Sequence, residues 1–308
     1  MSRISKVDTL RHRPEQDDPS WQESFFLGWC DITSNSGGSH HISLCPHLGL
    51  AHVWSWTIVG GERVARFQEH RLSLPDRDFD DMQLGSIRFA SGDDLRKLSL
   101  RGEFERGELS LAFDAYTDPL ELDFQAGGLK LGSSHYECMG RITGEAAFDG
   151  NHTAVAGVGW HDHSWGPRKF RSNPTGRWFY AVFGDDLAFS VYSLGSASGT
   201  VQFGYVLDHG AIAMVRKVQF RARMADDGIS PLGCDALIWT HNGRGYRVKG
   251  EVSACALTGG TGWSGDTEFF TMDGLAQFEC GGRLGQGFLE VTEARALTPE
   301  MRKELKLT

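Results

Sequence analysis

The sequence predicts an all-β protein of two tandem barrel-like halves. Three observations lead to this prediction: apolar and polar residues alternate along many short runs, turn-forming residues separate these runs, and the chain has 39 glycines but only 9 prolines. Alternation with a period of two is typical of antiparallel strands with one buried face, and frequent glycine suits a chain that turns often. With 308 residues, 40% of them hydrophobic, the chain can bury two domain cores.

Nine strands are predicted in the first half. The run 97–104 alternates clearly between apolar and polar residues, and a turn at Arg106-Gly107 leads into a similar run. Asp149-Gly150-Asn151 is a tight-turn sequence, so it predicts a hairpin between the strands on either side. The predicted strands lie near 24–31, 39–45, 50–59, 63–72, 84–90, 97–104, 108–116, 134–148 and 153–163.

The second half repeats this pattern after a turn-rich stretch from Gly166 to Gly176. Its strands are predicted near 177–183, 187–194, 200–207, 211–223, 234–240, 244–254, 267–279 and 283–295. Roughly eight strands on each side could close into barrels that leave no exposed edge. Two packed β-sandwiches are the alternative, and the sequence does not separate the two arrangements.

The chain divides into a polar N-terminal segment and two domains. The segment covers residues 1–20, the first domain 21–170 and the second domain 171–308. The only predicted helix is C-terminal, at 299–306, because Thr298 is a good N-cap and Pro299 suits the first helical position.

Composition excludes several classes of protein. The net charge of −9, with acidic and basic residues interspersed, argues against a nucleic-acid partner, which needs a basic surface. No stretch approaches the roughly 20 apolar residues of a membrane helix, and the N-terminus lacks the apolar core of a signal peptide. The six cysteines are scattered without a CxxC pair. A soluble, cytoplasmic protein with free thiols is therefore expected. The sequence leaves open whether the protein forms a homodimer.

Motifs for nucleotide-dependent and hydrolytic chemistry are absent. The sequence contains no GxxxxGK[ST] phosphate loop, no GxGxxG between a strand and a helix, no Gly-x-Ser-x-Gly elbow and no HExxH. We therefore expect no cofactor.

The run from Gly159 to Arg168 is the densest cluster of polar and aromatic residues in the chain. Strand alternation divides its side chains between two faces. One face carries His161, His163 and Trp165, and the other carries Trp160, Asp162 and Ser164. An imidazole with a pKa near 6.5, or a neighbouring carboxylate, can act as a general acid or base. The structural alternative is that these groups only pin the strand end to the linker.

His135 and Glu137 form a second candidate cluster. They share a strand face, and counting back from the turn at Gly150 puts them near the same sheet end as His161 and His163. Two His/carboxylate clusters on paired strands indicate acid–base chemistry more strongly than one, although a cross-strand polar pair explains them equally simply. The catalytic candidates are Asp162, His163, His135, Glu137 and His161.

A metal site on His161 and His163 is a further alternative, because His-x-His on a strand is a known ligand spacing. A cupin-type site also needs a Glu a few residues later, and residues 164–168 contain none, so no metal is expected. The many aromatic residues could instead line a cavity for an apolar molecule, although paired tryptophans on one strand face are more often core. The binding candidates are Trp160, Trp165, Tyr136, Trp54, Trp56 and Tyr205.

The run from Gly159 to Arg168 resembles the Asp-His-(Ser/Asn)-Trp-Gly signature of the AttH-like and carotenoid 1,2-hydratase-like (CrtC-like) superfamily. Supporting matches are His135-Tyr136-Glu137, Gly140-Arg141-Ile142-Thr143-Gly144 and Gly204-Tyr205-Val206. The resemblance implies two lipocalin-like β-barrels with a ligand pocket in or between them. It also implies water addition to an isolated double bond or a ring-forming reaction, without a nucleotide or metal.

By position, the resemblance makes Asp162, His163 and Trp165 the signature residues. Many relatives have Arg where this chain has His161, which weakens the transfer of a particular substrate. The first hypothesis is thus a cofactor-independent lyase or isomerase, of the hydratase, dehydratase or cyclase type. Its substrate would be an apolar small molecule such as a terpenoid, polyketide or steroid-like compound.

In this hypothesis Asp162 or His163 moves the proton, and tryptophan rings stabilise developing positive charge. The second hypothesis is a non-catalytic lipocalin-like protein that binds a hydrophobic ligand, with the run acting as a clamp between the halves. The third is a metal-dependent enzyme that uses His161 and His163.

Overall fold

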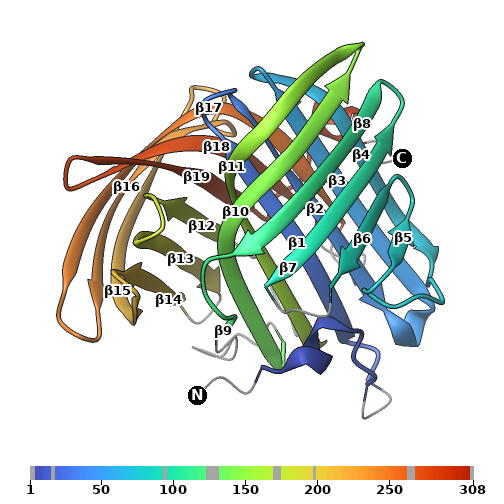
Figure 1. The fold of residues 1–308 in the computed structure, drawn as a ribbon, viewed down its shortest axis with the longest axis horizontal. Helices are drawn as coiled ribbons and strands as arrows, with labels where there is room; N and C mark the ends of the chain where they lie inside the picture. Colours follow the sequence, from blue (N-terminus) through green and yellow to red (C-terminus); the bar gives the residue numbers. More distant parts are fainter. Residues whose placement is uncertain are drawn as a thin grey trace. The chain divides into compact units, whose positions relative to one another are not determined.

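The computed structural model describes residues 4–14, 18–92, 96–122, 132–168, 175–196, 199–261 and 268–305. The chain divides into two compact units, Met1–Lys169 and Phe170–Thr308, and each is described by itself. Both units are built from antiparallel strands (Figure 1). None of the helices in the described part of the chain is long and apolar enough to span a membrane.

The first unit is one curled antiparallel sheet. Its strands are β1 (Trp21–Asp31), β2 (Ser36–Cys45), β3 (Leu50–Val59), β4 (Glu62–Ser73), β5 (Met82–Leu84), β6 (Ile87–Ser91), β7 (Lys97–Phe104), β8 (Gly107–Ala115), β9 (Leu120–Glu121), β10 (Ser134–Phe148) and β11 (Asn151–Pro167). They lie in the order β4-β3-β2-β1-β11-β10-β8-β7-β6-β5, and β9 pairs with β10. Two short 3-10 helices, η1 (Lys6–Thr9) and η2 (Pro46–Leu48), precede β1 and β3.

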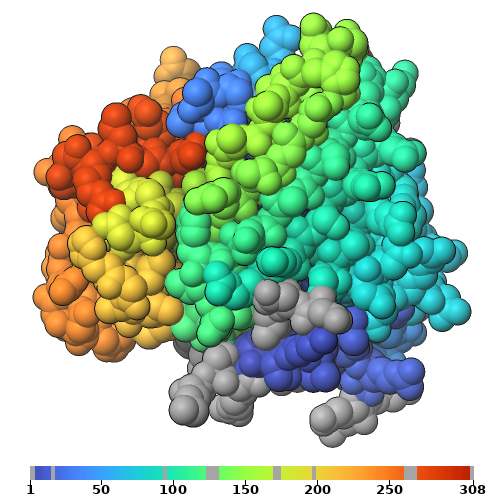
Figure 2. Space-filling model, viewed as in Figure 1, coloured from blue at the N-terminus to red at the C-terminus, as the bar shows by residue number. Residues whose placement is uncertain are grey.

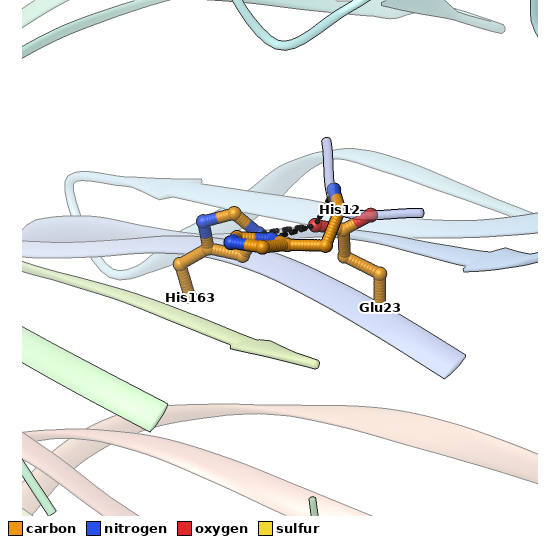
Figure 3. A group of neighbouring side chains, drawn as sticks. All are labelled: His12, Glu23 and His163. Atoms are coloured by element: carbon orange, nitrogen blue, oxygen red, sulfur yellow. Dashed lines mark hydrogen bonds and ion pairs between the residues drawn. The ribbon is translucent and has the colours of Figure 1, made fainter. Parts of the chain in front are cut away.

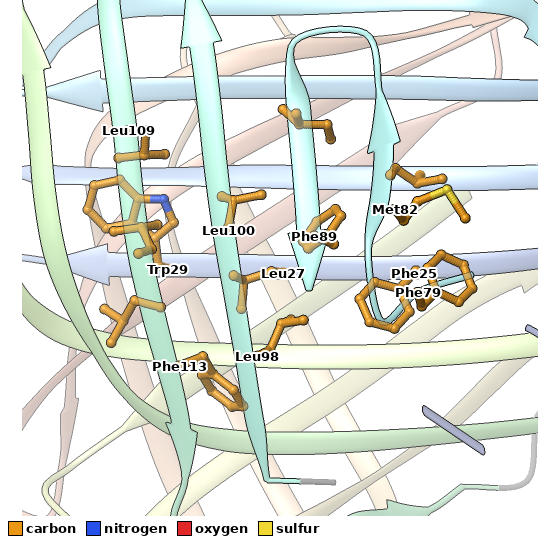
Figure 4. Close-up of a cluster of buried hydrophobic side chains, with 14 of the residues drawn as sticks. Phe25, Leu27, Trp29, Phe79, Met82, Phe89, Leu98, Leu100, Leu109 and Phe113 are labelled. Atoms are coloured by element: carbon orange, nitrogen blue, oxygen red, sulfur yellow. The ribbon is translucent and has the colours of Figure 1, made fainter. Parts of the chain in front are cut away.

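Strand alternation builds the core of the first unit. On β1, Phe25, Leu27 and Trp29 are fully buried on one face. They share one apolar core with Leu100 of β7 and Phe89 of β6 (Figure 4), and also with Ala65 of β4, at the other end of the sheet order. The sheet therefore curls around a shared apolar core, as a strand with one apolar face requires.

The second unit is a closed barrel of eight strands. They are β12 (Thr175–Val182), β13 (Leu187–Ser196), β14 (Gly199–Asp208), β15 (Ala211–Met224), β16 (Pro231–Thr240), β17 (Gly245–Thr261), β18 (Glu268–Cys280) and β19 (Arg283–Glu293). Its interior is packed by apolar side chains such as Phe179, Phe189 and Phe278. Closure pairs β12 with β19 and removes the exposed edges.

The C-terminal helix α1 (Pro299–Glu304) starts where the sequence predicts it. The Thr298 hydroxyl accepts a hydrogen bond from the Met301 backbone N–H at 3.2 Å, and Pro299 occupies the first turn. Met301 and Leu305 are buried in a small apolar cluster with residues of β17 and β18. The helix thus contributes its own apolar contact to the second unit.

The predicted all-β class, the two curled or closed sheets and the C-terminal helix are confirmed. The predicted hairpin around Gly150 is confirmed as well, because Phe148 pairs with Asn151. The sequence missed the two shortest strands, β5 and β9, and ended β11 several residues early. Most of the predicted turn-rich stretch from Gly166 to Gly176, residues 169–174, lies outside the described residues.

Candidate functional site

Strand β11 presents the signature run on two faces. His161 and His163 lie opposite Leu27 and Phe25 of β1, so they share the face of the first unit's core. Asp162 points to the other face, because neighbouring residues of a strand alternate. The predicted separation of Asp162 from the two histidines is therefore what the structure shows.

The His135/Glu137 pair lies on the face of Asp162, not on that of the histidines. Glu137 pairs directly with Asp162, and His135 pairs with Ser164. The His135 Nε2 and Glu137 Oε1 atoms are 3.0 Å apart, and their side chains are 2% and 3% exposed. The pair lies at the sheet end of His161 and His163, as predicted, but directly opposed residues share a face, so it lies beside Asp162 and not beside the two histidines. We call this side of β10, β11 and β1–β3 the Asp162 face.

Aromatic rings line the Asp162 face beside these polar groups. The Trp160 ring lies 5.7 Å from that of Phe26, and His41 packs between Phe26 and Trp54 at 5.8 and 4.1 Å. Register places Trp54 opposite His41 on β2, and Trp56 lies fully buried two residues further along the same face. The predicted binding residues Trp160, Trp54 and Trp56 thus lie on the same face as Asp162.

Gly28 makes room for the Trp160 ring. The two residues are directly opposite on β1 and β11. A Cβ atom at Gly28 would lie 1.9 Å from the indole ring, so any larger residue would displace the ring. The position of Trp160 on the Asp162 face therefore depends on a glycine of the neighbouring strand.

Burial keeps the imidazoles of this face neutral. It lowers the pKa of His41 to about 3, and the charges of Arg168 and His52 act in the same direction. Burial also lowers the pKa of His135, although the hydrogen bond and charge of Glu137 oppose the shift. The face therefore combines carboxyl groups, neutral imidazoles and one guanidinium.

Arg168 supplies the positive charge of the Asp162 face. Its Nη2 donates a hydrogen bond to Ser164 Oγ at 2.7 Å. Burial lowers the pKa of Arg168 to about 10, while the charges of Asp162, Cys45 and Glu23 partly offset the effect. The guanidinium stays charged at neutral pH and favours the anionic form of a nearby carboxyl group.

His161 is held by two hydrogen bonds on the core side. Its Nδ1 lies 2.7 Å from the Phe26 carbonyl oxygen, and its Nε2 lies 3.3 Å from the Tyr136 hydroxyl. Burial lowers its pKa to about 3, so the ring is neutral, donates from Nδ1 and accepts at Nε2. Burial also raises the pKa of Tyr136 well above 10. Both residues are buried in the core of the first unit, on the face opposite Asp162.

His163 belongs to a separate cluster with the N-terminal segment. Its Nε2 lies 2.9 Å from Glu23 Oε1, and His12 Nδ1 lies 2.8 Å from the same oxygen (Figure 3). His163 Nδ1 lies 2.8 Å from the backbone oxygen of Asp8, and His12 Nε2 lies 3.1 Å from the Asp8 carboxylate. The Trp165 ring stacks on His12, with centroids 3.6 Å apart. We call these residues the His12–Glu23–His163 cluster.

Hydrogen bonds and charges within the cluster shift the pKa values of His12 and Glu23. Burial alone would lower the pKa of His12, but hydrogen bonds and charges from Glu23 and Asp8 outweigh it and raise the pKa. Burial alone would raise the pKa of Glu23, but hydrogen bonds and charges from His12 and His163 lower it instead. No spacing pattern in the sequence points to Asp8 and His12, because they lie before the first strand, Asp8 in the short helix η1 and His12 in the irregular residues after it.

The second unit holds a further carboxyl pair. Glu290 of β19 pairs directly with Asp273 of β18 and with Trp178 of β12, on the face opposite the barrel core. Burial raises the pKa of Glu290 to about 7, while a hydrogen bond from Thr292 opposes the shift. Tyr205, a predicted binding residue, is buried opposite Ser190 on this unit. Of the two carboxyl groups, only Glu290 stands out in the sequence, as a single carboxylate near a strand centre.

Comparisons with known proteins bear on the family and the fold. Residues 5–295 match the family described as "Domain of unknown function (DUF7064)". No functionally curated protein shows significant sequence similarity to the chain.

Solved structures give the fold relationship. An AttH-like protein from Nitrosomonas europaea has a TM-score of 0.64 at 14% identity, covering 90% of this chain and 93% of its own. Kievitone hydratase from Nectria haematococca has a TM-score of 0.63 at 14% identity, and the match covers 95% of this chain and 93% of the hydratase. CghA has a TM-score of 0.63 at 13% identity, and the match covers 90% of this chain and 88% of CghA. The all-β fold that the resemblance implies is therefore confirmed, because the chain shares its fold with these three structures.

Proposed function

The chain belongs to the DUF7064 family, and from its Asp162 face we propose that it is a cofactor-independent lyase or isomerase acting on an apolar small molecule. One observation carries this proposal: Asp162 and Glu137 are directly opposed on paired strands, beside the neutral imidazole of His135 and a wall of aromatic rings. Groups that donate and accept protons next to apolar surface are what acid–base chemistry on an apolar substrate needs.

Asp162 is the residue of this face that we assign to the reacting atoms. It is partly exposed, whereas Glu137 and His135 are almost fully buried. In a hydration, the carboxylic acid of Asp162 gives its proton to one alkene carbon, and water adds to the other carbon. The water then loses a proton, which restores the acid. A dehydration follows the same steps in reverse order with the same groups. A cyclisation needs only the protonation and deprotonation steps.

The remaining groups of the face have supporting roles in this proposal. Glu137 and His135, joined by their hydrogen bond, act as positioning residues for Asp162 or relay its proton. Trp160 and Trp54 offer aromatic faces that stabilise developing positive charge on the substrate. Arg168 favours the carboxylate that forms when Asp162 releases its proton.

The fold relatives support the class of reaction. One relative is by name a hydratase of kievitone, and CghA has been solved with Sch210972 bound. The terpenoid, polyketide or steroid-like nature of the substrate is part of the same proposal and rests on the aromatic lining of the Asp162 face.

The two alternative hypotheses find less support. A lipocalin-like protein carries its ligand inside the barrel, whereas the interiors of both units are packed with buried apolar side chains. A metal-dependent enzyme on His161 and His163 needs free ring nitrogens, whereas both nitrogens of His161 contact Phe26 and Tyr136.

Isotope labelling tests the proposal before the substrate is identified. A panel of prenylated, terpenoid and polyketide compounds is incubated with the protein in H₂¹⁸O and in D₂O, and the products are analysed by mass spectrometry. Hydration adds one ¹⁸O, whereas cyclisation leaves the mass unchanged in H₂¹⁸O.

Asp162→Asn should lower turnover about a hundredfold or more. Asp114→Asn, the same change at an exposed carboxylate of β8, is the matched control and should keep full activity. Equal activity of the Asp162→Asn and wild-type proteins would exclude Asp162 as the acid.

A further inference from the structure

Three side chains of the first unit converge on a point away from the Asp162 face. Glu23 comes from β1, His163 from β11 and His12 from the N-terminal segment. One ligand atom of each lies within 4.8 Å of the others. Figure 3 shows the two imidazoles meeting at the Glu23 carboxylate. His163 and Glu23 are fully buried, and the His12 side chain is 20% exposed.

Asp8 fixes which nitrogen of each imidazole carries a proton. His163 Nδ1 lies 2.8 Å from the Asp8 carbonyl oxygen, which can only accept, so Nδ1 donates. His12 Nε2 lies 3.1 Å from the Asp8 carboxylate, so Nε2 donates as well. The other two nitrogens, His163 Nε2 and His12 Nδ1, both face Glu23 Oε1, at 2.9 and 2.8 Å.

Neutral imidazoles would therefore direct two lone pairs at a carboxylate oxygen. Such an arrangement requires positive charge between the three groups, either as two further protons or as one divalent cation. Glu23 Oε1 already accepts the His12 backbone N–H at 2.9 Å. Its other oxygen, Oε2, is buried and has no hydrogen-bond partner in the described part of the chain. A ligand atom that is buried without a partner has to be explained.

We propose that His12, Glu23 and His163 bind one divalent transition-metal ion of the zinc class. Two imidazoles and one carboxylate are a known ligand set for Zn²⁺, which takes water or another ligand in its fourth position. Each histidine already donates its distal N–H to an acceptor of Asp8, as metal-bound histidines usually do. The charges of Asp8 and Glu23 balance a divalent cation.

The separations from Glu23 Oε1 to the two imidazole nitrogens are close to those of an occupied site, and the three ligand atoms all lie within 4.8 Å of one another. A tetrahedral Zn²⁺ with bonds of about 2.0–2.1 Å holds its ligand atoms about 3.3 Å apart. The contacts of 2.8 and 2.9 Å to Glu23 therefore widen by a few tenths of an ångström on binding. Mg²⁺ and Ca²⁺ prefer oxygen ligands only, so they fit this ligand set poorly.

The proposed ion would fasten the N-terminal segment to the sheet. Residues 4–14 lie along the lower edge of the first unit in Figure 2, and His12 joins them to both β1 and β11 through the cluster. The ring of Trp165 stacks on His12 from the other side. This role is independent of the reaction proposed for the Asp162 face, because the cluster lies on the opposite face of β11.

Zinc titration of the full-length protein tests the proposal. The protein is freed of metal with a chelator, then titrated with Zn²⁺ in competition with a chromophoric chelator, and separately with Co²⁺ while visible absorption is recorded. We expect one Zn²⁺ per chain and a visible Co²⁺ spectrum typical of a tetrahedral site. His12→Ala should lose the Co²⁺ spectrum and weaken Zn²⁺ binding more than tenfold, and Asp8→Asn should weaken it about 10–100-fold.

Two controls make the outcome decisive. His152→Ala, at an exposed histidine of β11, should bind Zn²⁺ like the wild type. His12→Ala changes a residue that precedes the sheet, and its circular dichroism without metal should match the wild type, which shows that the variant folds. The proposal fails if the folded wild type binds less than one Zn²⁺ per chain, or if His12→Ala and Glu23→Gln bind it with wild-type affinity.

Discussion

Glu290→Gln should remove a specific pH dependence of stability from the second unit. Burial raises the pKa of Glu290 from 4.5 to about 7. At pH values between these two pKa values, the folded chain therefore keeps a proton on Glu290, whereas the unfolded chain has released it. The stability contributed by the protonated carboxyl is complete below about pH 4.5 and is lost as the pH rises through about 7.

The size of this effect follows from the two pKa values. One pKa unit corresponds to about 1.4 kcal/mol, so a rise from 4.5 to about 7 gives at most about 3 kcal/mol. Gln is neutral at every pH and keeps a similar volume. The difference in the free energy of unfolding, wild type minus Glu290→Gln, should thus fall by about 3 kcal/mol between about pH 4.5 and pH 8.

Urea unfolding at several pH values measures this difference. The difference is needed because buried histidines titrate in the same range with the opposite sign. His40 and His161 have pKa values lowered to about 3 by burial, so their contribution to stability rises with pH up to the unfolded value near 6.5. Fluorescence and circular dichroism should report coincident transitions if the unfolding is two-state.

A second variant sharpens the test of Glu290. Thr292 Oγ1 donates a hydrogen bond to Glu290 Oε1 at 3.1 Å, which favours the carboxylate. Thr292→Val should raise the pKa of Glu290 further and extend the fall of stability to higher pH. A wild-type minus Glu290→Gln difference that stays constant across this pH range would refute the buried, protonated carboxyl.

Two further predictions concern a buried histidine of the core and the glycine that makes room for the Trp160 ring. His161→Ala leaves the Tyr136 hydroxyl and the Phe26 carbonyl without their imidazole partner. We expect the free energy of unfolding, measured with urea, to fall by about 2–4 kcal/mol, and a fall below about 0.5 kcal/mol would show that these bonds do not hold the core. Gly28→Ala puts a Cβ atom 1.9 Å from the Trp160 ring. It should lower the free energy of unfolding by about 1–3 kcal/mol and change the near-ultraviolet circular dichroism spectrum, and an unchanged spectrum would contradict the packing of Gly28 against Trp160.

Alternation made most of the fold predictable. Runs such as 97–104 have one fully apolar face, and that face is the one buried in the structure. β5 and β9 were missed because they contain three and two residues, too few to show a period. Whether the strands closed into barrels or stacked as sandwiches depends on pairings such as β12 with β19, which join residues far apart in the sequence.

The candidate site was only partly predictable for the same reason. Alternation correctly divided His161 and His163 from Asp162. The face of His135 and Glu137 depends on the register of the β10–β11 hairpin, and a change of one residue in register exchanges the two faces of a strand. Glu23 and His163 lie 140 positions apart and meet through β1–β11 pairing, so no local pattern could have joined them.

Comparing binding with turnover in Asp162→Asn tests the central claim most directly. Once a compound that the protein converts is known, its affinity is measured by equilibrium titration, and its conversion is followed in a single turnover with excess protein. The account predicts that Asp162→Asn binds the compound with nearly wild-type affinity and converts it about a hundredfold or more slowly. Conversion at the wild-type rate by this variant would contradict the assignment of Asp162 as the acid.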